Sequence, residues 1–158
     1  MGSKPTSDQR RIVNKKARHE YHILDTIEAG IALTGSEVRS IRNGRAQITD
    51  GFVRINGFEA TLYGCQIDRY EHAVEAKYDP KRKRRLLLHR REIRRLSAQL
   101  AQKGVTLIPI SIYFNPRGLA KVELALATGK QQYDKREDLK KRQHQRDIDR
   151  ATGRRRNT

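Results

Sequence analysis

Apolar and polar residues alternate over several stretches between residues 21 and 128, and this alternation predicts a protein built mainly from β-strands. In the first stretch, Tyr21, Ile23 and Ile27 share one predicted face, although Asp25 interrupts it. Gly30 permits a bend where this strand ends. Residues 14–21, which are mostly polar and basic, lead into the strand.

Two further stretches, 47–55 and 58–67, flank the dipeptide Asn56-Gly57. Asn-Gly between alternating runs predicts a β-hairpin with a type I′ turn, because both central residues of that turn need a positive φ. The connection that follows, residues 68–78, has no regular pattern. Leu86-Leu87-Leu88 is predicted to pack after a basic run.

A longer strand is predicted over residues 105–114, and the turn 115–118 sends the chain back in a second strand. Pro109 has no N–H, so it is predicted at an edge or at a bulge. The predicted core residues of this pair are Ile108, Ile110, Ile112 and Phe114, then Val122, Leu124 and Leu126, with Lys121 and Glu123 outside.

A short helix is predicted over residues 34–42. Thr34 or Ser36 can cap it, Glu37 lies in its first turn, and Gly44 can end it in the left-handed conformation. The residues of its predicted buried stripe are Val38 and Ile41, and its end carries Arg39, Arg42 and Arg45 close together.

A second helix is predicted from about His89 to Lys103 and ends at Gly104. Glu92 can take part in a capping box, although His89 is a poor cap residue. Its apolar positions at helical spacing are Ile93, Leu96 and Leu100. Short strands joined by hairpins, with these helices between them, predict a mainly β fold with an antiparallel, closed or nearly closed small barrel.

The last thirty residues differ from the rest of the chain. Residues 129–158 contain 11 Lys and Arg against 5 Asp and Glu, and their only aliphatic anchors are Leu139, Ile148 and Ala151. Pairs such as Glu137 with Lys141 add only about 0.2–0.5 kcal/mol to a helix. We therefore expect three regions: a disordered segment 1–12, a folded domain 13–128, and a basic tail 129–158 that is disordered when free and helical when bound to RNA.

The whole chain has 35 Lys and Arg against 18 Asp and Glu, a formal net charge of +17. Such a surplus favours a polyanionic partner, with nucleic acid ahead of an anionic membrane surface. No apolar run is long enough for a membrane span or a signal peptide. The single Cys65 excludes an internal disulfide framework and favours the reducing cytoplasm.

A dense group of cations follows the irregular connection. Lys81–Arg85 together with Arg90, Arg91, Arg94 and Arg95 gives nine cations within 15 residues, against the single acid Glu92. A solvated helix face is the usual explanation for single charges. Because like charges at this density repel one another, phosphate contact is the better interpretation here.

Other candidate residues leave two interpretations open. Glu28 could form a salt bridge with a nearby Arg, or its carboxylate could accept hydrogen bonds from a base edge. Tyr133 could be an ordinary exposed tyrosine, or a platform on which a base stacks. His19 and His22 are three residues apart, which on a strand places them on opposite faces, so a metal site is not expected. No catalytic arrangement stands out, so we expect binding and not catalysis.

Four sequence motifs occur in a recognisable order. They are Asn14-Lys15-Lys16-Ala17-x-His19-Glu20-Tyr21; Glu28-Ala29-Gly30-Ile31-x-Leu33-x-Gly35-x-Glu37-Val38-Arg39-Ser40; Asp79-Pro80-x-Arg82-x-Arg84-x-Leu86-Leu87-Leu88; and Gly129-Lys130-x-x-x-Asp134-Lys135-Arg136. In this order the chain resembles the small protein B family, bacterial proteins that bind transfer-messenger RNA (tmRNA). The resemblance covers about Ile12 to Arg146.

The resemblance implies an oligonucleotide-binding-type β-barrel, with two to three flanking helices, that holds the tRNA-like domain of tmRNA at its elbow. It also implies trans-translation, the rescue of ribosomes stalled on messages that lack a stop codon. The family's RNA-contact positions fall on Glu28, Leu87 and Lys121. Positions on or near the same surface are Asn14, Lys15, Lys16, His19, Tyr21 and Arg42.

The family's tail enters the empty decoding site and messenger channel, and its positions here are Lys130, Tyr133, Asp134, Lys135 and Arg136. The position of Tyr133 is aromatic or His in the family, which favours the stacking interpretation. Gln131 and Gln132 replace lysines that are common there. The connection 70–78 and the extreme N-terminus match no family pattern, so no function is assigned to them.

These observations lead to one expected function and two alternatives. We expect a cytoplasmic RNA-binding adaptor, not an enzyme, with no cofactor and no metal, that acts as a monomer with one copy per tmRNA and has the ribosome as its second partner. A ribosomal or ribosome-assembly protein with a basic tail fits the composition equally well, and only the ordered motifs separate the two. A ribonuclease that uses His and carboxylates is the third hypothesis.

Overall fold

The computed structural model describes residues 11–155, apart from the side chains of Gln132, Tyr133, Arg154 and Arg155. Of the predicted disordered segment 1–12, residues 1–10 lie outside the described residues, and Ile12 belongs to the first strand. The elements in chain order are β1 Ile12–Val13, α1 Ala17–Glu20, β2 Tyr21–Ile31, α2 Gly35–Arg42, β3 Ala46–Gln47, β4 Phe52–Asn56, β5 Glu59–Tyr63, β6 Gln66–Ile67, β7 Arg84–Leu87, α3 Arg90–Leu100, β8 Val105–Phe114, β9 Ala120–Gly129 and α4 Gln132–Arg155.

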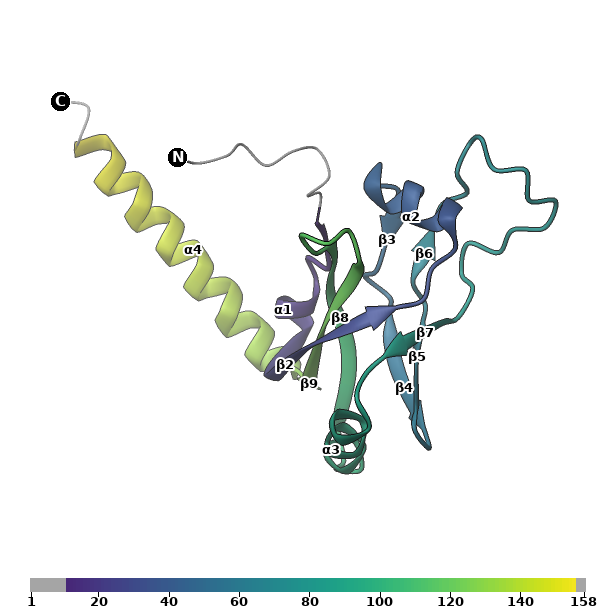
Figure 1. Cartoon of the computed structure of the whole chain (residues 1–158). Coiled ribbons are helices and arrows are strands. Elements are labelled where there is room, and N and C mark those ends of the chain that lie inside the picture. Colours follow the sequence, from purple (N-terminus) through teal and green to yellow (C-terminus); the bar gives the residue numbers. More distant parts are fainter. Residues whose placement is uncertain (1–10, 156–158) are drawn as a thin grey trace.

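The main sheet is antiparallel and closes on itself. Its strand order is β1-β8-β4-β5-β7-β2-β9, and β8 also pairs with β9, so the strands from β8 to β9 form a ring (Figure 1). β3 and β6 pair separately beside this ring. The predicted antiparallel barrel is therefore confirmed, although the long stretches predicted around the first hairpin are each divided between two strands.

The interior of the barrel is apolar. Leu62, Leu107, Ile112 and Leu124 are completely buried, and they belong to one continuous cluster. The inward positions predicted on the return strand are confirmed, because all three are buried in this cluster; these residues are Val122, Leu124 and Leu126.

A smaller apolar cluster lies on the outer face of β2, β8 and β9. Ala125 and Ala127 alternate with the inward residues of β9, and Ala17 of α1 packs over them together with Ile108 and Ile110. The prediction that Ile108 and Ile110 face the same core as Ile112 is wrong. The register of β8 shifts between Pro109 and Ser111, and this irregularity at the predicted proline bulge changes which face the neighbouring side chains occupy.

The hairpin β4–β5 is confirmed, but its turn is not the predicted one. Asn56 pairs with Glu59, so the two central residues are Gly57 and Phe58. Gly57 has a φ of 61°, and it is the only residue of this turn with a positive φ. A positive φ at the first central residue alone is the pattern of a type II′ turn, so the type I′ prediction is wrong.

The helix α2 begins as predicted. The Thr34 side chain accepts a hydrogen bond from Glu37 N, and the Glu37 carboxylate accepts one from Thr34 N, which completes a capping box. Gly44 has a φ of 74° just after the helix. The buried stripe differs from the prediction, because Val38 is only half-buried whereas the polar Glu37 is fully buried.

Two other helical predictions need correction. The approach 14–21 contains a one-turn helix, α1, so His19 lies in a helix and not on a strand. The helix α3 spans Arg90–Leu100 and is shorter than predicted. At its start the Glu92 carboxylate accepts a hydrogen bond from His89 N, as half of the predicted capping box.

A buried ion pair joins α2 to β7. The side chains of Glu37 and Arg84 are both completely buried, and Arg84 Nε donates to Glu37 Oε2. Three of the four remaining guanidinium hydrogens of Arg84 go to the carbonyl oxygens of Cys65 (2.9 Å), Arg82 (2.8 Å) and Pro80 (3.2 Å). Arg84 thus fixes the chain on either side of the irregular connection.

The electrostatics of this pair also involve Arg82, which donates to Glu37 Oε1. Burial alone would raise the pKa of Glu37, but hydrogen bonds from Arg82, Thr34 N and Arg84 outweigh burial and lower that pKa below its usual 4.5. The prediction that the whole run Lys81–Arg85 contacts phosphate is therefore wrong for Arg84, which is buried, and Arg82 is already paired.

Replacing Arg84 by Met should strongly destabilise the protein, because the buried charge of Glu37 would lose its buried partner and keep only the partly exposed Arg82. Breaking such a pair costs about 3–5 kcal/mol, measured as the change in unfolding free energy in urea. Arg85→Met is the matched control, because Arg85 lies 4.0 Å from Glu59 in an exposed ion pair, and such pairs contribute about 0–1 kcal/mol. Equal losses for the two variants would contradict the structural role of the buried pair.

Candidate nucleic-acid interface

A hollow of about 510 Å³ opens on the outer face of the barrel where β7, β2 and β9 lie side by side. Glu28, Leu87 and Lys121 line it. Gly30 on β2 forms its floor, because Gly30 pairs with Leu87 on one side and with Lys121 on the other. A Cβ atom at Gly30 would lie 3.1 Å from Leu87 Cβ and would fill this floor.

The three family-derived RNA-contact positions are thus brought together by strand pairing. The side chain of Leu87 is 56% exposed, so the prediction that Leu86, Leu87 and Leu88 all pack is wrong for the middle residue. Leu86 points into the barrel and Leu87 points out of it, as the alternation of a strand requires. Beside the carboxylate of Glu28 on β2, and across β2 from Lys121, Leu87 offers an apolar contact surface.

Glu28 is held by a tyrosine and not by an arginine. Tyr113 on β8 donates a hydrogen bond from its hydroxyl group to Glu28 Oε2. Partial burial, and then the Glu28 carboxylate, raise the pKa of Tyr113 to about 12, so at neutral pH this phenol remains a donor. The salt bridge predicted as the default for Glu28 is absent among the described residues.

A second carboxylate lies directly opposite the first. Glu123 on β9 pairs in register with Glu28, and like charges in this position repel each other. Ser111 Oγ donates to Glu123 at 3.1 Å, and the Arg11 guanidinium lies 3.5 Å from the same carboxylate oxygen. Arg11 also lies 4.3 Å from the centre of the Tyr113 ring. Sequence reasoning missed Tyr113 and Arg11, because only strand pairing brings them to this face. Tyr113 of β8 pairs with Lys121 of β9, and Ile12, which follows Arg11, pairs with Ile112 of β8.

The segment 14–21 lies at the far end of the same outer face. Tyr21 pairs with Gly129, and Glu28 lies seven residues further along β2, about 23 Å away. Lys15 and Lys16 are exposed there, whereas His19 and Tyr21 are half-buried. Asn14 is different.

Asn14 has a structural role in this segment. Its side chain is 5% exposed, Nδ2 donates to Pro109 O at 3.1 Å, and its backbone N donates to Ile110 O at 2.7 Å. These bonds attach the approach to α1 to strand β8. Asn14 therefore positions its neighbours, and its side chain is not exposed to a partner in this structure.

Arg42 lies at the end of α2, next to the turn between β8 and β9. Its guanidinium is 4.7 Å from the centre of the Phe114 ring. This places Arg42 at the same end of β9 as Lys121, since Phe114 pairs with Ala120.

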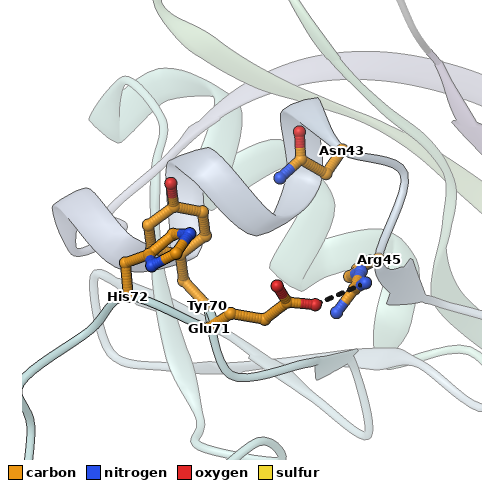
Figure 2. Close-up of a pocket in the computed structure, with 5 residues that line it drawn as sticks. All are labelled: Asn43, Arg45, Tyr70, Glu71 and His72. Carbon is orange, nitrogen blue, oxygen red and sulfur yellow. Dashed lines mark ion pairs between the residues drawn. The ribbon is translucent and has the colours of Figure 1, made fainter.

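A second hollow, of about 280 Å³, lies between the end of α2 and the irregular connection (Figure 2). Tyr70 and His72 meet edge to face, with ring centres 5.4 Å apart, and Arg45 forms an ion pair with Glu71 at 2.8 Å. Arg39 lies 5.5 Å from the Tyr70 ring centre. Sequence reasoning assigned no function to this connection, and it missed the hollow.

The basic run and α3 present an uneven charged surface. Arg91 and Arg94 are exposed, whereas Arg95 lies 2.5 Å from Asp25. Arg90 covers the ring of Phe58 at 4.9 Å. The predicted phosphate-binding group thus retains exposed cations both in the loop, at Lys81 and Lys83, and on α3.

The root of the tail is attached to α1. Lys130, with a side chain 7% exposed, donates from Nζ to Arg18 O at 2.9 Å and to Asp138, and its backbone N donates to Glu20 O at 2.9 Å. Asp134 lies 3.4 Å from His22 Nε2. From this root, α4 extends away from the barrel (Figure 1).

The remaining tail positions differ in what they present. Lys135 is half-exposed and Arg136 is exposed. Tyr133 belongs to α4, but its side chain lies outside the described residues. The apolar Leu139 and Ile148 are 52% and 43% exposed, so they do not anchor the helix to the barrel.

Metal-binding groups and membrane-spanning helices are both absent from the described part of the chain. No group of three or more His, Cys, Asp or Glu side chains there could hold a metal ion. None of its helices is long and apolar enough to cross a membrane.

Comparison with known proteins shows to which family this chain belongs. The family model described as "SmpB protein" matches residues 11–154. The chain belongs to the SmpB protein family. It is 50% identical over 154 residues to an "SsrA-binding protein" of Desulforamulus reducens, a match that covers 96% of each chain.

A second relative and a chain of a solved structure are also similar to this chain. An "SsrA-binding protein" of Moorella thermoacetica is 55% identical over 138 residues, which cover 87% of this chain and 89% of the relative. A chain of the solved structure described as "tmRNA-SmpB: a journey to the center of the bacterial ribosome" is 51% identical, with a TM-score of 0.66. That match covers 77% of this chain and 85% of the other.

We expect Glu28→Gln to leave the stability of the protein nearly unchanged. The variant keeps an acceptor for Tyr113 and removes the repulsion from Glu123, so the unfolding free energy should change by less than about 0.5 kcal/mol. Urea unfolding measures this change, with Arg84→Met as the destabilised reference. A loss above about 2 kcal/mol would make Glu28 a structural residue and not a surface contact.

Proposed function

We propose that this chain binds the tRNA-like domain of tmRNA through the hollow formed by Glu28, Leu87 and Lys121, and that it delivers tmRNA to ribosomes stalled on messages without a stop codon. Membership of the SmpB family carries the general function, an RNA-binding adaptor of trans-translation. The observation that supports the specific site is the convergence of these three side chains around Gly30.

The three side chains proposed to bind RNA each offer a different contact. Lys121 supplies a cation for a phosphate, and Leu87 supplies an apolar surface for a base or ribose. The Glu28 carboxylate, which Tyr113 orients, accepts a hydrogen bond from a base edge, as the base-reading interpretation of Glu28 requires. The family relatives are named for binding an RNA, so the chain is an adaptor and not an enzyme.

The cations around this hollow extend the contact surface in our proposal. Lys15 and Lys16 at one end of β2, and Arg42 at the other, neutralise further phosphates. Asn14 and Tyr21 hold the approach to α1 against the barrel and thereby position the two lysines, and the half-buried His19 lies between them in sequence.

The tail performs the second half of the proposed function. In our proposal its first turns, including Lys130, Tyr133, Asp134, Lys135 and Arg136, enter the decoding site, and the rest of α4 follows the empty messenger channel. The exposed surface of α4 and its surplus of basic residues support this assignment. The exposed apolar anchors support a tail that is disordered in the free protein and helical against ribosomal RNA.

The proposal also states where the chain acts and in how many copies. The adaptor acts in the cytoplasm, as one copy of the chain per tmRNA. A ribosomal or ribosome-assembly protein, the alternative from the sequence, has no specific observation in its favour beyond the basic composition.

Lys121→Ala tests the barrel site. Loss of one phosphate contact should weaken binding of the tRNA-like domain and reduce the slope of log K against log salt by about 0.7–0.9. Gel-shift titrations at several salt concentrations measure both effects. Lys103→Ala is the matched control, because the exposed Lys103 precedes the end of β8 that pairs with Thr128, far along β9 from Lys121. Equal effects for both variants would contradict the assignment of the hollow.

Removal of residues 131–158 tests whether the barrel binds tmRNA by itself while the tail acts on the ribosome. The truncated chain keeps Lys130 with its bond to Arg18 and keeps the entire barrel, so its affinity for tmRNA should stay within about 3-fold of the full chain. Peptide tagging on stalled ribosomes in a reconstituted translation system should be abolished. The triple change of Asp134, Lys135 and Arg136 to Ala is the finer variant, and it should lower tagging while leaving binding intact. A collapse of RNA affinity on truncation would contradict the proposal.

A further inference from the structure

The outer face of β4, β5 and β7 carries aromatic and basic side chains. Val53, Ala60, Leu62 and Leu86 on these strands point inward and are buried. The residues between them therefore point outward. The outward residues are Phe52, Arg54 and Asn56 on β4, Glu59, Thr61 and Tyr63 on β5, and Arg85 and Leu87 on β7.

An aromatic pair lies at one end of this face. Phe52 and Tyr63 are directly opposite each other on β4 and β5, and their rings stack with centres 5.4 Å apart and planes 11° apart. Both side chains are half-exposed. Aromatic pairs of this kind stabilise hairpins, but this pair also leaves aromatic surface open to solvent.

Cations lie beside the pair, on its side toward the tip of the hairpin. The Arg54 guanidinium lies 5.3 Å from the Phe52 ring centre and 5.9 Å from that of Tyr63. Arg85 follows across β5, where it pairs in register with Thr61. At the tip of the hairpin, Phe58 is 50% exposed beneath Arg90. Glu59, which lies 4.0 Å from Arg85, is the one acid among the outward residues of these three strands.

This face is continuous with the hollow. Arg85 and Leu87 are two residues apart on the outer face of β7, about 7 Å along the strand, and Leu87 lines the hollow. From Arg85 to Arg54 the path crosses β5 and covers about 10 Å. Basic and aromatic side chains thus form a path from Lys121 and Leu87 to the Phe52–Tyr63 pair. Consecutive groups on this path are separated by at most one strand.

We propose that Phe52, Arg54, Tyr63 and Arg85 form a stacking surface for unpaired nucleotides of the RNA that occupies the hollow. A base stacks on the aromatic pair, beside or in place of the Arg54 guanidinium, and Arg54 and Arg85 bind the phosphates on either side of it. This inference rests on the proposed function, because the hollow supplies the neighbouring nucleotides.

The chemistry of the surface favours single-stranded RNA over the other anionic partners. Aromatic rings flanked by cations bind a base face and a backbone at once, whereas a paired helix keeps its bases stacked inside. An acidic peptide would use the cations but would leave the aromatic pair without a stacking partner.

Binding of the isolated tRNA-like domain to three variants tests this inference. Tyr63→Leu should raise the Kd at least about 5-fold through loss of stacking, and Tyr63→Phe should restore it to the value of the unchanged chain. Arg54→Gln should weaken binding and reduce the salt slope by about 0.7–0.9. Arg146→Gln removes the same charge from an exposed position of α4, the helix that extends away from the barrel (Figure 1), and should have no effect. Unchanged affinity for both Tyr63→Leu and Arg54→Gln would overturn the inference.

A fluorescence measurement guards against a folding defect in Tyr63→Leu. The chain contains no Trp, so Tyr63→Trp creates a single reporter on the stacking surface. Its emission should be quenched when the tRNA-like domain binds, and Tyr70→Trp, in the hollow beside α2, should not be quenched. Binding without quenching at position 63 would overturn the proposal, and equal quenching at both positions would also do so.

Two failures can be told apart in this design. If the unchanged chain does not bind the tRNA-like domain, the proposed function fails. If it binds and Lys121→Ala weakens binding while the Tyr63 and Arg54 variants do not, the proposed function stands and only the stacking surface is wrong. Quenching by an acidic peptide in place of the RNA would assign the surface to a protein partner and would overturn the inference.

Discussion

Strand β9 pairs along its length with β2 on one side and with β8 on the other, and this double pairing closes the barrel. Because successive side chains of a strand point to opposite faces, closure sorts every residue of β9 to the inside or the outside. Val122, Leu124 and Leu126 fill the interior, while Lys121 and Glu123 meet solvent. The same pairing that builds the core therefore builds the proposed RNA-binding surface.

Closure also explains why the site contains residues far apart in sequence. Gly30 pairs with both Leu87 and Lys121, so a single position without a side chain joins three strands into one hollow. Closure brings Glu28 opposite Glu123 as well, and a tyrosine, a serine and an arginine offset that repulsion. The two carboxylates of Glu28 and Glu123 are thus adjacent because of the strand register.

Local patterns in the sequence predict those parts of the fold that depend on neighbouring residues. The cap at Thr34, the turn at Gly118 and the inward residues of β9 follow from chemistry within a few positions. The exposure of Leu87 and the burial of Arg84 could not be predicted in this way. Both depend on which face of β7 meets the barrel interior, and that is decided by strands more than 20 residues away.

The candidate site follows the same division. Its family-derived members Glu28, Leu87 and Lys121 could be named from motifs, whereas Tyr113 required the register of β8. Pro109 shows the limit most clearly, because its lack of an N–H predicts an irregularity but not the side to which Ile108 and Ile110 then turn. Basic character alone also did not distinguish Arg84, which completes the core, from Arg85, which faces solvent.

The bond between Lys130 and Arg18 has a mechanical consequence. It joins the first residues after β9 to the turn of α1, which Asn14 in turn ties to β8. In its helical form α4 has 24 residues and spans about 36 Å, so it acts as a lever arm whose pivot is this joint. A tilt of about 10° at the pivot displaces the far end by roughly 6 Å. A small change in the orientation of the barrel therefore produces a larger displacement at the far end of α4. The orientation of the short helix α1 sets where that end can reach.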